Sequence, residues 1–210
     1  MKTDITVVLD RSGSMASIAS DVIGGLNTFI RTQAQVEGEA CFTLVQFDDH
    51  YEVVHAHVPV QIVPPLTERT YVPRGSTALL DAIGRTIVAT GARLAMMPEA
   101  DRPQVVIFAV QTDGLENASR EFTRQQVFDM IRHQEAKYAW QFLFLAADQD
   151  AIAEGDKMGF SAASALDYDK DGDGVAALYN AMASKVGDVR RGQASRIAFT
   201  QADRARTKRR

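Results

Sequence analysis

The chain has one cysteine, one tryptophan, six prolines and no long apolar run among its 210 residues. The lone Cys41 excludes a disulfide framework, and its place in an apolar stretch favours a small buried residue over a reactive thiol. The prolines and the 14 glycines are scattered, which excludes a low-complexity linker and a collagen-like repeat. No apolar run approaches the roughly 18 residues needed to cross a bilayer, so we expect no contact with a membrane.

A secretory leader is also missing from the start of the sequence. The apolar run Ile5–Leu9 begins almost at Met1. A leader needs a basic segment, a longer apolar stretch and a small-residue cleavage site, for which this sequence has no room. With one cysteine and no leader, we expect a cytoplasmic protein.

Charge is unevenly distributed along the chain. The net charge is −4, but residues 189–210 carry eight Lys or Arg and one acid, whereas the other 188 residues carry 15 basic and 26 acidic groups. We therefore expect one globular domain over residues 1–188 and a basic C-terminal tail over residues 189–210. A solvated tail is the simpler interpretation. The alternative is that the tail docks on an acidic partner, which could be a protein or a nucleic acid. Of these two we do not expect a nucleic acid.

Short apolar runs alternate with stretches of helical periodicity along the sequence. The runs predict strands at residues 5–9, 41–47, 105–110 and 140–146, a hairpin partner at 51–57, and a weak strand at 162–166. The periodic stretches predict helices at residues 18–30, 80–94, 122–134 and 175–186, and a short one at 150–157. This alternation indicates an α/β fold: a doubly wound, mostly parallel sheet with helices on both faces and one antiparallel edge hairpin.

Polar side chains gather where the predicted strands end. Asp10, Ser12 and Ser14 follow the first strand, Asp113 follows the strand at 105–110, and Thr77 precedes the second long helix. In such a sheet, ligands bind at the carboxyl ends of the strands. Two carboxylates and three hydroxyls are hard oxygen donors that suit Mg²⁺ or Mn²⁺. Each piece alone also fits a helix cap or a turn, but their joint occurrence in this order favours a metal site.

The pattern Asp10-x-Ser12-x-Ser14, followed by Thr77 and Asp113, resembles the metal-ion-dependent adhesion site (MIDAS) of the von Willebrand factor type A (vWA) family. By this resemblance, the two serines and the threonine supply hydroxyl ligands, and the two aspartates act mainly through bound water. Repulsion between the two carboxylates is expected to destabilise the metal-free protein at neutral pH.

The order of the elements is also similar to the vWA family, from residue 2 to about residue 186, and the chain resembles small stand-alone bacterial or phage members. The resemblance implies a Rossmann-like vWA fold and a non-enzymatic protein-interaction module. In such a module the ligands of the metal are mostly neutral, so that an Asp or Glu carboxylate of a protein partner completes its coordination. The resemblance also suggests an AAA-type ATPase system as the partner.

Two other functions use the same features differently. A metal-dependent hydrolase or phosphotransferase would use the same acidic site and would need a general base near the metal. Asp48 and Glu116 are the nearest candidates for that base. A binder of nucleic acid or of an acidic protein would instead act through the basic tail, and its binding would be sensitive to salt.

A second, less favoured metal site follows the weak strand. Asp169, Asp171 and Asp173 match the first half of a calcium-binding EF-hand loop. The twelfth position is Asn180, where such a loop needs a bidentate glutamate. We therefore keep Ca²⁺ at these three aspartates as an alternative to an Asp-rich turn that caps the last helix.

Overall fold

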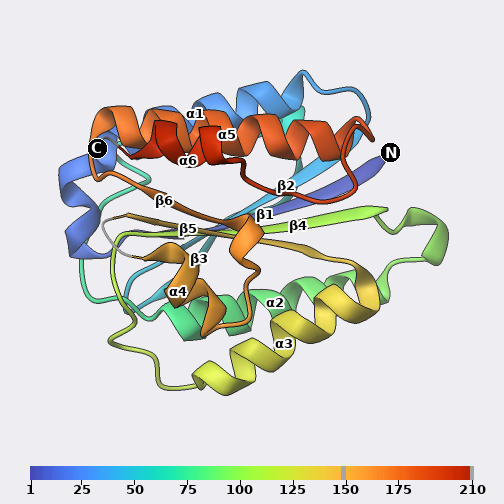
Figure 1. Ribbon diagram of the computed structural model, residues 1–210. Helices are drawn as coiled ribbons and strands as arrows, with labels where there is room; N and C mark the ends of the chain where they lie inside the picture. The colour runs from blue at the N-terminus through green and yellow to red at the C-terminus, as the bar shows by residue number, and fades with distance from the viewer. Residues whose placement is uncertain (148–149, 209–210) are drawn as a thin grey trace.

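The computed structural model describes residues 1–147 and 150–208, in which six strands form one sheet in the order β3-β2-β1-β4-β5-β6 (Figure 1). The strands are β1 (Lys2–Asp10), β2 (Glu39–Phe47), β3 (Tyr51–Pro59), β4 (Val105–Thr112), β5 (Gln141–Ala147) and β6 (Ala165–Tyr168). Only β2 and β3 run antiparallel, and the other neighbouring pairs are parallel. The predicted mostly parallel sheet with one edge hairpin is therefore confirmed.

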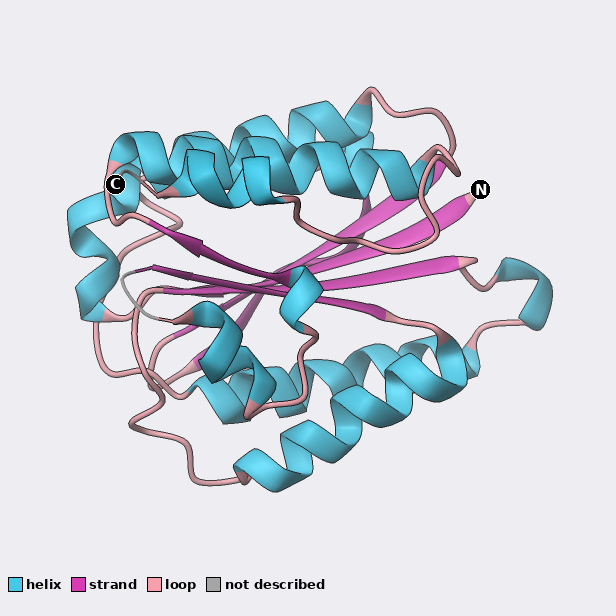
Figure 2. Cartoon of the chain, viewed as in Figure 1, coloured by secondary structure: helices cyan, strands magenta, loops and turns pink. Residues whose placement is uncertain are grey.

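Helices cover both faces of this sheet (Figure 2), as the sequence predicts. One face carries α1 (Ala19–Ala34), α5 (Gly172–Arg190) and α6 (Gln201–Thr207); the other carries α2 (Leu79–Met96), α3 (Arg124–Tyr138) and α4 (Ala151–Asp156). Short 3-10 turns lie at η1 (Gly13–Ile18), η2 (Val60–Ile62), η3 (Glu99–Asp101) and η4 (Ala162–Ser164). Within the described residues, no helix has the length and apolar character needed to span a membrane.

Strand β1 lies at the centre of the sheet, and its side chains enter both halves of the core. Ile5 and Leu9 pack under α1 and α5, whereas Val8 packs on the opposite side with the residues under α2 and α3. Side chains on a strand alternate between faces, so a strand buried on both faces is a continuous apolar run. Because β1 pairs with β2 on one side and with β4 on the other, the strand order reverses between β1 and β4. Ligands of such sheets bind at that point.

The expected boundary at residue 188 falls inside α5, which continues to Arg190. The Arg190 guanidinium is buried and donates hydrogen bonds to the backbone carbonyls of Gln33, Val36 and Gly38. The Gln33 carbonyl lies in the last turn of α1 and the other two follow it, at a point where a helix leaves its C=O groups without intrahelical partners. A basic residue that composition alone assigns to a solvated tail therefore completes the end of a helix.

The segment after α5 packs on the domain up to residue 208, so it is not a solvated tail. Ile197 and Phe199 are buried in the core beneath α1 and α5. The Phe199 N–H donates to the Ala163 carbonyl at 2.8 Å, and the Arg204 guanidinium donates to the Ala165 carbonyl at 2.8 Å. These contacts cover the chain at the start of β6, which is an edge strand and would otherwise expose unpaired backbone groups.

Candidate metal centre

The carboxyl ends of β1 and β4 bring together residues that are far apart in the sequence. Ser14 Oγ donates a hydrogen bond of 2.6 Å to Asp113 Oδ1, and Ser12 Oγ lies 3.1 Å from Ser14 Oγ. A Cβ atom built on Gly114 would lie 3.5 Å from Thr77 Oγ1 and 3.8 Å from Ser14 Oγ, so these two hydroxyls flank the same point. The structure therefore gathers Ser12, Ser14, Thr77 and Asp113 at the edge of the sheet where β1 ends.

Asp10, the last residue of β1, is the fifth predicted residue, and it is buried beneath the hydroxyl groups. Its side chain is buried, and its two oxygens accept hydrogen bonds of 2.6 Å from the Ser12 N–H and the Thr112 hydroxyl. Burial raises the pKa of Asp10 to about 6, even though both hydrogen bonds act to lower it. The charge of Asp113 adds to the increase, so the expected repulsion between the carboxylates is present, but it is smaller than the effect of burial.

The backbone of Thr77 is held in place by Asn117. The Thr77 N–H donates to Asn117 Oδ1 at 2.9 Å, and the Asn117 N–H donates to the Thr77 carbonyl at 3.1 Å. This pair of bonds ties the loop before α2 to the loop after β4. The positions of Thr77 and of the Asp113 loop are therefore coupled, and Asn117 is a positioning residue that the sequence patterns do not identify.

Two carboxylates, one in the loop that follows Asp113 and one on the first turn of α2, fix the conformation of that loop. Glu116 accepts hydrogen bonds from the N–H of Leu80 and from two N–H groups of its own loop. Asp81, on the first turn of α2, accepts from the three successive N–H groups of residues 120–122. Glu116 was a candidate general base, but its oxygens are used to organise the backbone beside the site.

Asp48, the other candidate base, follows β2 at the same edge of the sheet. It is buried, and its Oδ2 lies 3.1 Å from Arg11 Nε and 2.9 Å from Arg74 Nε. Burial by itself raises the pKa of Asp48, but a hydrogen bond from the His50 N–H and the two guanidinium groups outweigh it and lower the pKa below its usual value. This carboxylate is therefore ionised and paired with two cations.

A second group of side chains that could bind a metal lies outside the predicted MIDAS. Within the described residues, Asp48, Asp49 and His50 form the one group of three His, Cys, Asp or Glu side chains whose ligating atoms all lie within 4.8 Å of one another. The three aspartates at 169, 171 and 173 do not form such a group. Asp171 instead caps α5 by accepting a 2.7 Å hydrogen bond from the Gly174 N–H, as the alternative of an Asp-rich capping turn requires.

The donor set at the ends of β1 and β4 fits a hard divalent cation. The carboxylate oxygens of Asp10 and Asp113 and the three nearby hydroxyls are the ligand types that such ions prefer. Gly114 has no side chain to fill the space between the hydroxyls of Thr77 and Ser14. The residues predicted from the sequence to bind a metal therefore lie together at this edge of the sheet.

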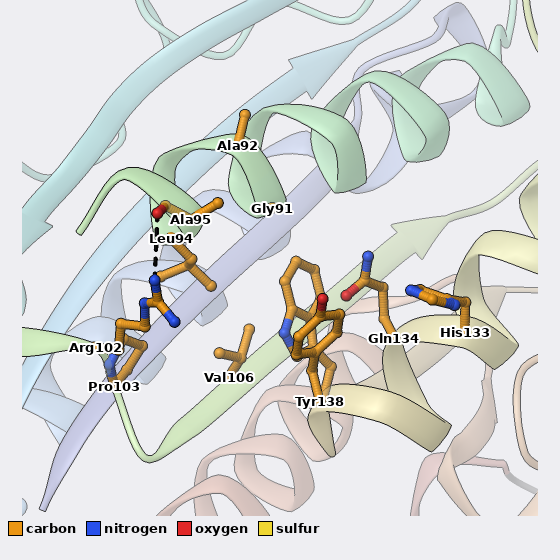
Figure 3. A pocket seen from close by; sticks show the side chains of 11 residues that line it. Gly91, Ala92, Leu94, Ala95, Arg102, Pro103, Val106, His133, Gln134 and Tyr138 are labelled. Carbon is orange, nitrogen blue, oxygen red and sulfur yellow. Dashed lines mark hydrogen bonds between the residues drawn. The ribbon is translucent and has the colours of Figure 1, made fainter. Parts of the chain in front are cut away.

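A cavity of about 620 Å³ lies at the other end of the molecule, between α2, α3 and the first residues of β4 (Figure 3). Its walls include Trp140, Tyr138 and His133, and Arg102 donates to the Ala95 carbonyl at 3.3 Å along one side. The cavity is near the amino ends of the strands, whereas the five predicted metal-site residues are at their carboxyl ends. It is therefore separate from the candidate metal centre.

Comparison with known proteins identifies the fold. No protein-family description and no curated protein matches the sequence. Among solved structures, proximal thread matrix protein 1 from the mussel byssus, with a zinc-occupied MIDAS motif, has a TM-score of 0.59 and 15% identity over 88% of this chain and 46% of that chain. A von Willebrand factor type A protein from Catenulispora acidiphila has a TM-score of 0.59 and 13% identity over 88% of this chain and 42% of that chain.

A third solved structure matches over nearly its whole length. The vWF domain of the type V pili tip protein Mfa5 from Porphyromonas gingivalis has a TM-score of 0.64 and 10% identity, over 88% of this chain and 94% of that chain. The chain thus spans nearly all of this vWF domain, but less than half of the mussel protein and less than half of the Catenulispora protein.

Proposed function

We propose that this chain, whose fold is that of a von Willebrand factor type A domain, is a metal-dependent protein-interaction module and not an enzyme. The observation that carries the proposal is the hydrogen bond between Ser14 and Asp113, which joins the two halves of the MIDAS pattern at 2.6 Å. The metal would be Mg²⁺ or Mn²⁺, held by the residues of the predicted set: Asp10, Ser12, Ser14, Thr77 and Asp113.

A divalent ion at this site would supply a Lewis-acidic position for an Asp or Glu carboxylate of a protein partner. The three hydroxyl ligands would be neutral, so only the carboxylates of Asp10 and Asp113, acting mainly through bound water, would offset the charge of the ion. The chain's own side chains around the site are suited to contact a partner. Leu115, two residues after Asp113, is 59% exposed, and in the loop before Thr77 the Val72 residue is 51% exposed and the Arg74 side chain 58% exposed. We propose that these residues form the rim that a partner covers.

The contacts of the two candidate general bases, Asp48 and Glu116, favour an interaction role over hydrolysis. Asp48 is paired with Arg11 and Arg74, and Glu116 accepts from backbone N–H groups, so both carboxylates are already engaged within the domain. A general base must reach the proton that it removes. The geometry thus supports the non-enzymatic proposal, and a screen with generic phosphate esters tests it directly.

The contacts of the basic segment weigh against the third function, binding through a free basic tail. Arg190 and Arg204 donate to backbone carbonyls, and Lys208 lies 3.4 Å from Asp167. These three cations of the segment already have partners within the domain. We therefore propose a protein partner at the metal site, and an AAA-type ATPase of the cytoplasm remains the candidate that the family resemblance suggests.

An affinity pull-down from native extract, run with Mg²⁺ and with chelator and compared with Asp113→Ala, tests the function. We expect one set of proteins to be retained only with Mg²⁺ and only by the unaltered site. Asp156→Ala is the control, because Asp156 is exposed on α4. Partners that bind equally in chelator and with Asp113→Ala would contradict the proposal.

A further inference from the structure

The outer oxygen of Asp113 is in contact with a lysine of the chain itself. Lys170 Nζ lies 2.7 Å from Asp113 Oδ2, and the Asp113 side chain is fully buried, whereas that of Lys170 is 22% exposed. The contact is an ion pair without hydrogen-bond geometry. Asp113 is therefore shared: one oxygen accepts from the Ser14 hydroxyl and the other faces an ammonium group.

Lys170 belongs to the short turn between β6 and α5, and that turn is held on both sides. The Asp169 N–H donates to the Thr207 carbonyl and the Asp171 N–H to the Asp169 carbonyl, each at 2.8 Å. Asp171 caps α5, and a Cβ atom on Gly174 would lie 2.2 Å from the Asp169 carbonyl oxygen, so the turn packs tightly on the first turn of the helix. The backbone of Lys170 is thus fixed, and its side chain extends to the metal-site carboxylate.

This lysine changes the charge of the site. The two carboxylates of Asp10 and Asp113 carry two negative charges, and Lys170 returns one positive charge, which leaves one negative charge. A divalent ion would then make the loaded site singly positive, whereas without the lysine it would be neutral. The other nearby cations, Arg11 and Arg74, are already paired with Asp48.

We propose that Lys170 is a specificity-determining residue of the metal centre: its ammonium group weakens binding of the metal and keeps the loaded site positive, so that it selects an anionic group of the partner. This inference rests on the proposed function. A cation repels a second cation at short range, and attracts an anion by the same law. The lysine therefore has opposite effects on the two ligands, which a purely structural role would not produce.

Calorimetric titration of the 210-residue chain with Mn²⁺ alone tests the first effect. Lys170→Met keeps the length of the side chain and removes its charge, and we expect it to bind Mn²⁺ on the order of 10-fold more tightly than the unaltered protein. Lys170→Arg keeps the charge and is expected to restore weak binding. The matched control is Lys157→Met, which removes an exposed lysine that pairs with Glu154 on α4.

Acetate, added to the Mn²⁺-loaded proteins, tests the second effect. Water-proton relaxation by bound Mn²⁺ falls as acetate displaces water, and we expect Lys170→Met to need more acetate for the same decrease. Lys170→Gln is the second variant if the methionine variant does not fold. Mn²⁺ binding by Lys170→Met that is equal to or weaker than that of the unaltered protein overturns the role of Lys170, even where the unaltered protein binds Mn²⁺.

The outcomes separate this inference from the function on which it rests. If only the Lys170 variants bind Mn²⁺, the lysine is confirmed as the barrier, and the metal-dependent function of the unaltered chain is contradicted at the concentrations used. If none of the proteins binds Mn²⁺, both proposals are overturned.

Discussion

The hydroxyl of Thr112 donates a 2.6 Å hydrogen bond to the buried carboxylate of Asp10, across the pair of strands at which the sheet reverses its order. Thr112 is the last residue of β4 and Asp10 the last residue of β1, and neither side chain is exposed. The bond orients one of the two carboxylates of the candidate metal centre. The effect of burial on the pKa of Asp10 is nevertheless larger than that of this hydrogen bond, and it raises the pKa to about 6.

Metal binding should therefore depend on pH in the weakly acidic range. A proton and a metal ion compete for the Asp10 carboxylate, which is mostly ionised above its pKa of about 6 and mostly protonated below it. We expect the affinity for Mn²⁺ to be about 10-fold lower at pH 5 than at pH 7. Calorimetric titrations at the two pH values measure this, and equal affinities would contradict the proposed role of Asp10 as a ligand.

Without metal, the same carboxylate should make the protein more stable in mild acid. Its pKa is raised from 3.8 unfolded to about 6 folded, so between these values the folded state binds more protons, and stability falls as pH rises. The loss amounts to about 2 kcal/mol between pH 4.5 and 7, out of about 3 kcal/mol for the whole shift. Urea unfolding in chelator from pH 4.5 to 7 measures it, with Asp10→Asn as the variant that should lose this dependence.

Binding of a divalent ion should offset that cost. An ion that binds only the folded state stabilises it by about 2.7 kcal/mol at a free concentration 100 times the Kd. We expect Mg²⁺ or Mn²⁺ to raise the melting temperature by several degrees, and Asp113→Ala to abolish the increase. Asp156→Ala, on the exposed side of α4, should keep it. Melting curves that do not change at millimolar metal would contradict an occupied site.

Two adjacent glycines of α1 should respond to alanine with opposite signs. A Cβ atom on Gly25 would lie 2.2 Å from Cδ2 of Tyr179, whereas one on Gly24 meets nothing within 4 Å. Tyr179 is buried and donates a hydrogen bond to Gln111, so its ring has little freedom to move. We expect Gly25→Ala to destabilise the protein by about 1–3 kcal/mol, and Gly24→Ala to stabilise it by about 0.5–1 kcal/mol.

Urea denaturation of both glycine variants provides the comparison. Both variants replace a glycine of α1 with alanine. The difference between their free energies of unfolding therefore reports on the contact between α1 and α5. If both variants were stabilised, Tyr179 would not pack on Gly25 as described.

The sequence predicts the sheet because a strand buried on both faces leaves a strong pattern. The runs Ile5–Leu9 and Val105–Val110 became β1 and β4: β1 begins three residues earlier and ends one residue later, and β4 ends two residues later. The grouping of the five candidate metal-site residues was predictable for a related reason, since they follow or precede the strands and helices in a fixed order. Local patterns therefore place both the core and the edge of the sheet at which these residues gather.

Contacts between distant polar side chains are what the sequence does not reveal. Nothing in the local pattern shows that Lys170 reaches Asp113, that Asn117 holds Thr77, or that Glu116 serves the backbone. The charge composition of the C-terminal segment was misleading. Counting basic residues does not distinguish a solvated side chain from one that donates hydrogen bonds to backbone carbonyls. The Arg190 guanidinium, which is buried at the end of α1, illustrates the second case.

The packing of that segment leads to the last prediction. Phe199 is 7% exposed and lies in the core beneath α1 and α5, while Arg206, seven residues later, is exposed on α6. Truncating a buried phenylalanine removes apolar burial and leaves a cavity, so Phe199→Ala should cost about 3–5 kcal/mol. Arg206→Ala should change the free energy of unfolding by less than about 0.5 kcal/mol. Urea denaturation of the two variants distinguishes an integral part of the domain from a solvated basic tail, for which both substitutions would leave stability unchanged.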